Sequence, residues 1–137
     1  MGFDVYGRTP TSPAGKNFQR SMWTWNPLVE LCRHVNRTFA LGLAMDDWHY
    51  NDGEGLSTQD QCDRLAQALQ GYIETDWPKG KERLEIEVTP GIEQTVVDAI
   101  SRALPNVEVV GRGYGVDLED LLEWIEFLRH CGGFRLS

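Results

Sequence analysis

The segment from residue 17 to residue 35 (NFQRSMWTWNPLVELCRHV) constrains the fold most, because it joins an aromatic stretch directly to an apolar helix face. Asn26 and Pro27 form a typical helix start: Asn is a favoured cap, and the missing Pro amide would have no partner in the first turn. Four apolar residues then recur at helical spacing: Leu28, Leu31, Cys32 and Val35. The pattern predicts a helix from about Pro27 to about Phe39 whose apolar side is part of the core.

Three further helices and a few short strands are predicted along the chain. The strands are expected at residues 1–7, 84–88 and 107–110. The helices are expected from Ser57 or Thr58 as cap to about residue 73, over residues 90–103, and from Leu118 to about Arg129 with Asp117 as cap and Gly132-Gly133 as stop. Together they predict one helix-dominated α+β domain over residues 1–137, with about four helices. Residues 77–115 are a candidate inserted strand–helix–strand unit.

Length and cysteine usage exclude several classes of protein. A chain of 137 residues suits a single domain. Cys32, Cys62 and Cys131 are widely spaced and odd in number, which predicts neither a disulfide framework nor a zinc site, and no metal or cofactor is expected. With no signal-peptide pattern and no apolar run long enough to cross a bilayer, we expect a cytoplasmic protein without membrane association. The sequence indicates no oligomeric state.

Charge is distributed unevenly along the chain. The net charge is −8 overall, made up of +3 in residues 1–40, −7 in residues 41–76 and −4 in residues 77–137. An acidic balance argues against direct nucleic-acid binding, which needs Lys and Arg for the phosphates. It favours a protein partner with a basic surface.

The last predicted helix offers a candidate interaction surface. Its inward stripe is predicted to be Leu118, Leu121, Leu122, Ile125 and Leu128. Trp124 lies at the edge of that stripe and Phe127 nearly opposite, among four acids: Glu119, Asp120, Glu123 and Glu126. Aromatic residues in an acidic field are suited to a basic partner. The alternative is a solvated acidic face whose Phe127 is covered by the tail Phe134–Ser137.

A second hypothesis is a pocket for a small, nucleotide-like ligand. Aromatic residues near the two expected loops could stack on the ligand and Arg20 could bind its anion. The candidate residues are Arg20, Trp23, Trp25, Trp48, His49 and Tyr50. The sequence leaves open whether Trp23 and Trp25 face the core or solvent.

Enzymatic activity ranks last among the hypotheses. The loop at residues 46–54 holds Asp46, Asp47, His49 and Asp52, but Trp48 and Tyr50 occupy positions where a calcium loop needs oxygen ligands. Its Asn-Asp-Gly triplet is typical of a turn. The glycines at residues 111–115 have GxGxG spacing, a weak phosphate-binding signal that Asp117 opposes. No nucleophile motif supports a catalytic group.

Several motifs resemble a family of small uncharacterised proteins from bacteriophages, prophages and bacterial genomes. They are GFDVYG at residues 2–7 with Pro10, Ser12 and Gly15, Phe18 and Arg20, WTW and PL at residues 23–28, NDGEGL at residues 51–56, FLR at residues 127–129, and GGF at residues 132–134. Residues 77–115 are unlike the usual members, and Asn26 stands where members commonly have Arg. The phage association implies an accessory role against the host, such as inhibition of a defence complex.

Overall fold

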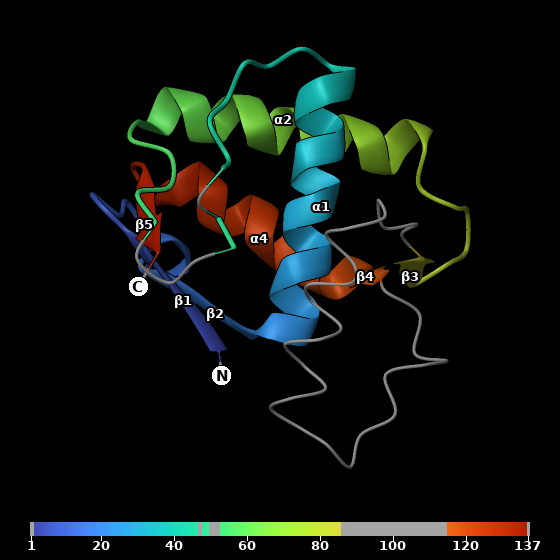
Figure 1. The fold of residues 1–137 in the computed structure, drawn as a ribbon, viewed down its shortest axis with the longest axis horizontal. Helices are drawn as coiled ribbons and strands as arrows, with labels where there is room; N and C mark the ends of the chain where they lie inside the picture. The colour runs from blue at the N-terminus through green and yellow to red at the C-terminus, as the bar shows by residue number, and fades with distance from the viewer. Residues whose placement is uncertain (1, 47, 50–52, 86–114, 137) are drawn as a thin grey trace.

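A computed structural model describes residues 2–46, 48–49, 53–85 and 115–136. The three α-helices in these residues are α1 (Met22–Thr38), α2 (Gln59–Thr75) and α4 (Leu118–His130). Helices α2 and α4 lie side by side and antiparallel, and α1 crosses them at a steep angle (Figure 1). The architecture is α+β, as predicted, with three helices in the described residues rather than four. The helix expected at residues 90–103 and the strand expected at 107–110 lie outside the described residues.

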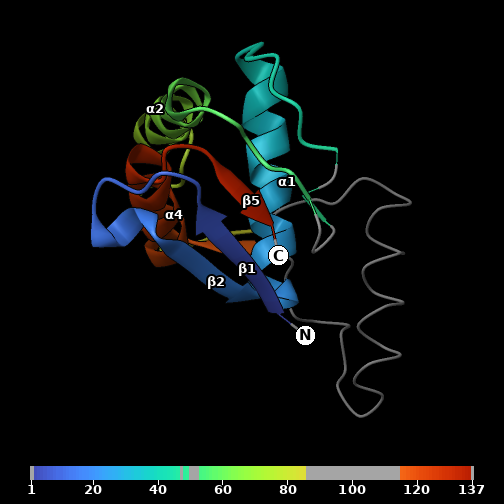
Figure 2. The same ribbon diagram turned by 90° about the vertical axis from the view of Figure 1, so that its left-hand side faces the viewer.

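A three-stranded antiparallel sheet closes one side of the domain. Its strands are ordered β2 (Asn17–Ser21), β1 (Gly2–Gly7) and β5 (Phe134–Leu136). The sheet packs against α4 and the start of α1 (Figure 2). Val5 of β1 is opposite both Phe18 and Leu136, and all three side chains are buried. The prediction of a strand at residues 1–7 is therefore confirmed, whereas β5 arises from residues that the sequence analysis assigned to a tail.

Helix α1 begins at Met22, earlier than the Asn26-Pro27 pair predicts. Ser21 takes the cap position, and Pro27 lies inside the helix. Pro27 has no amide to donate to the Trp23 carbonyl, but this costs only one hydrogen bond near the open end of the helix. The prediction of Asn26 as cap is wrong because its side chain bonds a residue far along the chain instead.

Helix α2 begins as predicted, with Thr58 as its cap. The backbone amide of Gln61 donates to Thr58 Oγ1 at 3.2 Å, and the Thr58 amide donates to Gln61 Oε1 at 3.3 Å. This reciprocal pair is a capping box, which satisfies two amides that the first helical turn leaves unpaired.

Two short strands and a glycine pair position α4. Strands β3 (Arg83–Glu85) and β4 (Gly115–Asp117) pair in antiparallel orientation, and Asp117 is the cap residue of α4. The strand predicted at residues 84–88 thus begins at Arg83, and its remainder lies outside the described part. After α4, Gly132 and Gly133 adopt φ of +69° and +89°, as expected of a glycine stop.

An aromatic cluster fills the space between these elements. Trp25 of α1 and Trp124 of α4 meet edge to face, with ring centroids 5.3 Å apart. Phe18 of β2 lies 5.0 Å and Phe134 of β5 lies 5.4 Å from the Trp124 ring. Trp48 adds a further edge contact to Phe134, and its carbonyl accepts a hydrogen bond from Trp25 Nε1 at 2.7 Å. Such ring pairs add about 0.5–1.5 kcal/mol each to simple burial.

Candidate functional site

The aromatic residues of α4 do not form the exposed contact surface that the sequence analysis expected. Trp124 is 0% exposed and Phe127 is 1% exposed. Phe127 lies 6.1 Å from Phe134, ring centroid to ring centroid, so the C-terminal residues cover it. Of the two alternatives considered for Phe127, coverage by the tail is the one observed. Neither aromatic side chain is accessible to a partner.

The physical reason is that α4 is covered on more than one side. Helix α2 packs along it on one side, while β2 and the 3-10 turn Pro13–Gly15 contact it from another. A helix between two layers buries a wider arc than the single stripe assumed from the sequence. The buried arc includes both aromatics and excludes Leu122, which is 46% exposed.

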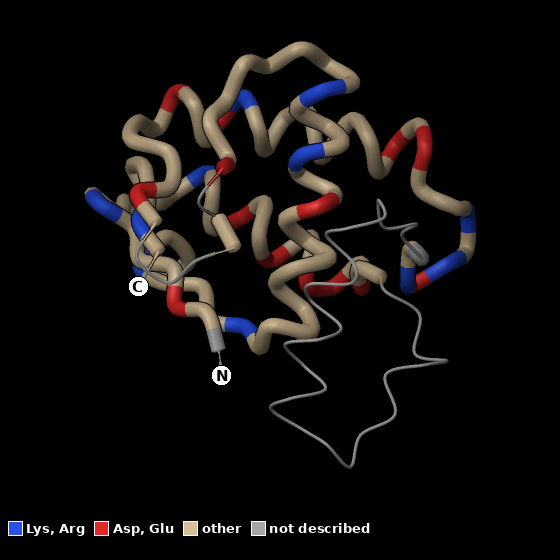
Figure 3. Tube along the Cα trace, viewed as in Figure 1, with Lys and Arg blue, Asp and Glu red and all other residues tan. Residues whose placement is uncertain are grey.

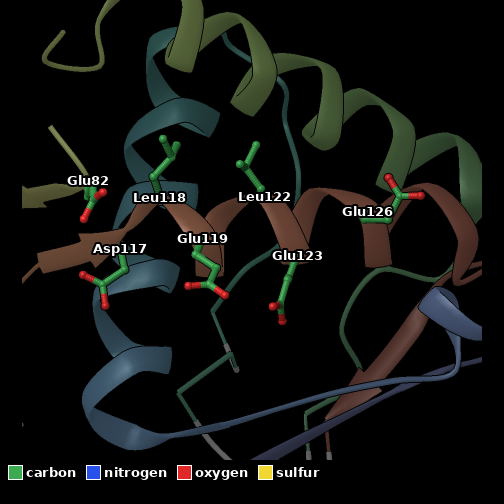
Figure 4. Close-up of a pocket in the computed structure, with 7 residues that line it drawn as sticks. All are labelled: Glu82, Asp117, Leu118, Glu119, Leu122, Glu123 and Glu126. Carbon is green, nitrogen blue, oxygen red and sulfur yellow. The ribbon is translucent and has the colours of Figure 1, made fainter. Parts of the chain in front are cut away.

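The exposed side of α4 forms an acidic groove, which we define by its lining residues. The groove has a volume of about 750 Å³ and is lined by Glu82, Asp117, Leu118, Glu119, Leu122, Glu123 and Glu126. In Figure 4, Glu119 and Glu123 point to one side of α4, whereas Leu118 and Leu122 point to the other. The four acids expected on this helix include three that line the groove. Asp120 lies beside it.

Part of this acidic charge is balanced by arginines. Arg83 Nη1 lies 2.9 Å from Asp117 Oδ1, and Arg20 Nε lies 2.9 Å from Asp120 Oδ1. Arg20 also pairs with Glu123 and lies over the Phe18 ring. Burial acts to lower the pKa of Arg20, but the hydrogen bonds to these two carboxylates raise it above the usual value. Arg20 is therefore occupied by carboxylates and is not a free anion-binding group.

Two acids of the groove are not balanced in this way. Glu82 and Glu119 form no ion pair with any other described residue. Along α4, Glu119 and Glu123 are four residues apart, a spacing at which like charges repel. Figure 3 shows acidic residues along α4. The groove thus combines net negative charge with one exposed leucine.

The residues proposed for a nucleotide-like pocket do not form an open pocket in the described part of the chain. Trp25 and Trp48 are fully buried in the aromatic cluster, so their faces are not available for stacking, because other rings and the backbone cover them. Trp23 is half-buried, and Tyr50 lies outside the described residues. For the two buried tryptophans the prediction is corrected: they are core residues.

His49 belongs to a separate polar cluster against α1. Its Nδ1 lies 2.7 Å from Asn26 Oδ1 and its Nε2 lies 3.1 Å from Glu30 Oε1. The imidazole thus bridges two polar side chains of α1 by hydrogen bonds. The hydrogen bond to His49 lowers the pKa of Glu30, against the effect of burial, and the nearby charges of Arg33 and Arg37 lower it further.

This cluster connects His49 to α1. Both His49 nitrogens lie within hydrogen-bond distance of a side-chain oxygen of that helix. Asp46 is exposed and lies 3.8 Å from Arg33, while Asp47 and Asp52 lie outside the described residues. Among the residues the structure describes, no three His, Cys, Asp or Glu side chains gather as a metal site would require.

Sequence analysis missed several of these groups. Asn26 and Glu30 are four residues apart within an apolar helix face, and that spacing was an available signal for a buried polar pair. Leu122 was assigned to the inward stripe, and no local signal places it outside. Glu82 joins the groove only because β3 pairs with β4.

None of the described helices has the length and apolar character needed to cross a membrane. No family model, curated protein or solved structure matches the chain.

Proposed function

We propose that this chain is a non-catalytic interaction protein whose acidic groove binds a basic protein surface. The observation that carries the proposal is the groove itself, which is lined by five carboxylates together with the half-buried Leu118 and the exposed Leu122. The charges would attract lysines and arginines and steer their approach, and Leu122 would contact an apolar side chain beside them. The partner is therefore a protein with Lys or Arg around an apolar residue.

Two further observations support binding over a purely structural role. Glu82 and Glu119 make no ion pair with another described residue, so a partner's cations would not displace an internal bond from them. The aromatic residues that a small-ligand pocket would need are mostly in the core.

The test is capture of a partner from bacterial lysate by the tagged full chain. The key variant combines Glu82→Gln, Glu119→Gln and Leu122→Ala, which removes two charges and the apolar contact without breaking an ion pair between described residues. A matched control combines Asp60→Asn, Glu74→Gln and Phe39→Ala, since Phe39 is also exposed, at 45%. We expect the groove variant to lose the partner and the control to retain it.

Salt provides an independent check on the same partner. Raising the salt from about 0.05 M to about 0.5 M should weaken binding several-fold, because exposed charges are then screened over about 4 Å instead of about 14 Å. A partner that binds the groove variant as well as the wild type, with no salt dependence, would contradict the proposal.

The resemblance to phage-borne proteins extends the proposal to a role, inhibition of a host defence complex. Expression of the chain in bacteria that carry such a defence should then restore phage plaques, and the groove variant should restore fewer than the matched control. Equal plaque counts for the two variants would show that inhibition of the defence complex does not depend on the acidic groove.

A further inference from the structure

Two of the three cysteine thiols are in contact. Cys62, in α2, and Cys131, directly after α4, are both fully buried, and their sulfur atoms lie 3.5 Å apart. They are 69 positions apart in sequence, which is why spacing gave no sign of the pair. Cys32 is also buried, in α1. All three are free thiols.

The surroundings fix the approach of these two sulfur atoms. Gln59 of α2 donates from Nε2 to the Leu128 carbonyl at 2.8 Å and accepts from the Gly132 amide at 2.6 Å. A side chain at Gly133 would meet the Ser57 carbonyl at 2.6 Å, so glycine allows this close contact between the backbones. A disulfide needs sulfur atoms about 2.05 Å apart, so its formation would bring these two sulfurs about 1.5 Å closer together.

Cys131 Sγ donates towards Cys62 Sγ and also lies 3.5 Å from the Leu128 carbonyl oxygen. The contact with Cys131, together with burial, raises the pKa of Cys62. Either sulfur can act as the nucleophile once it loses its proton, because the thiolate is the reactive form. At Cys32, burial raises the pKa to about 12, so this thiol is a matched unreactive control.

We propose that Cys62 and Cys131 form a reversible disulfide when a hydroperoxide oxidises them, which makes the pair a modification site that joins α2 to the end of α4. In the first step one of the two sulfurs, as its thiolate, attacks a peroxide oxygen; the O–O bond breaks, hydroxide leaves, and that cysteine becomes a sulfenic acid. In the second step the other sulfur, losing its proton, attacks the sulfenic sulfur. The S–O bond breaks as the S–S bond forms, and water leaves. Two thiols and one hydrogen peroxide thus yield one disulfide and two waters.

The disulfide would change stability more than shape. It closes a loop of roughly 70 residues, and in the chain-entropy account long loops gain most from closure. We expect Tm to rise by about 10 °C on oxidation. This inference does not depend on the proposed binding function, since neither cysteine lines the acidic groove.

The experiment treats the reduced full-length chain with hydrogen peroxide and then counts thiols after denaturation. The thiol count should fall from three to one. The intact mass should drop by two hydrogen atoms, and a digest should yield one peptide pair that joins Cys62 to Cys131. Dithiothreitol should restore all three thiols and the original Tm.

Variants separate this pair from general oxidation. Cys32→Ala should still lose two hydrogens and gain thermal stability, whereas Cys62→Ala and Cys131→Ala should do neither. Peptide mapping of the wild type decides the matter even if a variant fails to fold. The proposal is overturned if the wild-type thiols survive peroxide, if they gain oxygen without a cross-link, or if Cys32 appears in the cross-linked peptide.

Discussion

On one side of α4, Trp124 and Phe127 are enclosed by rings from β2, β5 and α1; on the other, Glu119, Leu122 and Glu123 face an open groove. Buried side chains contribute much to the stability of the fold, through dispersion contacts and the removal of apolar surface from water. Exposed side chains contribute little to it. One helix therefore presents a buried surface and an exposed one. The sequence pattern did not show that the aromatic residues belong to the buried surface, because aromatic residues are enriched in cores as well as in interfaces.

The largest expected effect is on the buried side. Trp124→Ala should lower the free energy of unfolding by about 3–5 kcal/mol, because it leaves a cavity in the aromatic cluster. Trp124→Phe is the matched variant: it keeps an aromatic ring at this fully buried position and removes the indole N–H. Urea unfolding should show the second variant to be clearly more stable than the first. Equal losses would mean that ring packing at this position matters less than its contacts indicate.

Two leucines that are neighbours in sequence test the same contrast between the buried and the exposed side of α4. Leu121 is fully buried, so Leu121→Ala should cost about 2–5 kcal/mol. Leu122→Ala should cost no more than about 0.5 kcal/mol, because its side chain remains largely in water. Thermal unfolding of the two variants would measure the contrast directly. Similar losses would show that Leu122 belongs to the core, which would remove the apolar contact from the proposed groove.

The comparison extends to charged side chains, with one buried carboxylate and one in the groove. Glu30 is the buried carboxylate. Glu30→Gln should cost about 1–3 kcal/mol at neutral pH, because it replaces a buried charge that His49 and nearby arginines stabilise. The folded state lowers the pKa of Glu30, so its stabilisation is present above the unfolded value of about 4.5 and is lost as pH falls through the lower folded pKa. The stability difference between wild type and Glu30→Gln, measured by urea unfolding, should therefore shrink below about pH 4.5. A difference that grows on acidification would contradict this assignment.

The smallest stability effect is expected in the groove. Glu119→Gln should change the free energy of unfolding by no more than about 0.5 kcal/mol, because relief of repulsion from Glu123 offsets a weaker interaction with the helix dipole. Chemical denaturation is again the measurement. A loss of several kcal/mol would mean that the groove acids hold the fold together and are not available for a partner.

Features set by a few neighbouring residues could be predicted from the sequence. The Thr58 cap, the glycine stop after α4 and the first strand follow from local hydrogen bonds, backbone freedom and alternation. These signals need no knowledge of what packs against them. They fixed the α+β class and most of the described helix ends.

Features that depend on contacts between distant parts of the chain could not be predicted from the sequence. The start of α1 moved because Asn26 bonds His49 instead of capping, and Phe127 turned inward because β5 returns to cover it. Leu122 and Glu82 became groove residues only through the packing of α2, β3 and β4 around α4. Three of the four acids predicted as interaction residues on α4 line the groove, whereas the two aromatic residues predicted with them are buried.

The clustered tryptophans also determine which optical signals this protein gives. Trp25 and Trp124 meet at 86° with centroids 5.3 Å apart, and Trp48 lies 6.3 Å from Trp124, so their excited states should couple. The near-ultraviolet circular dichroism should carry a strong signature of this junction and lose it when the core opens. No tryptophan lines the acidic groove, so a partner could bind there without changing indole emission. Tryptophan fluorescence therefore reports on the folding of this protein. A dye attached near Leu122 would be needed to detect a partner bound in the groove.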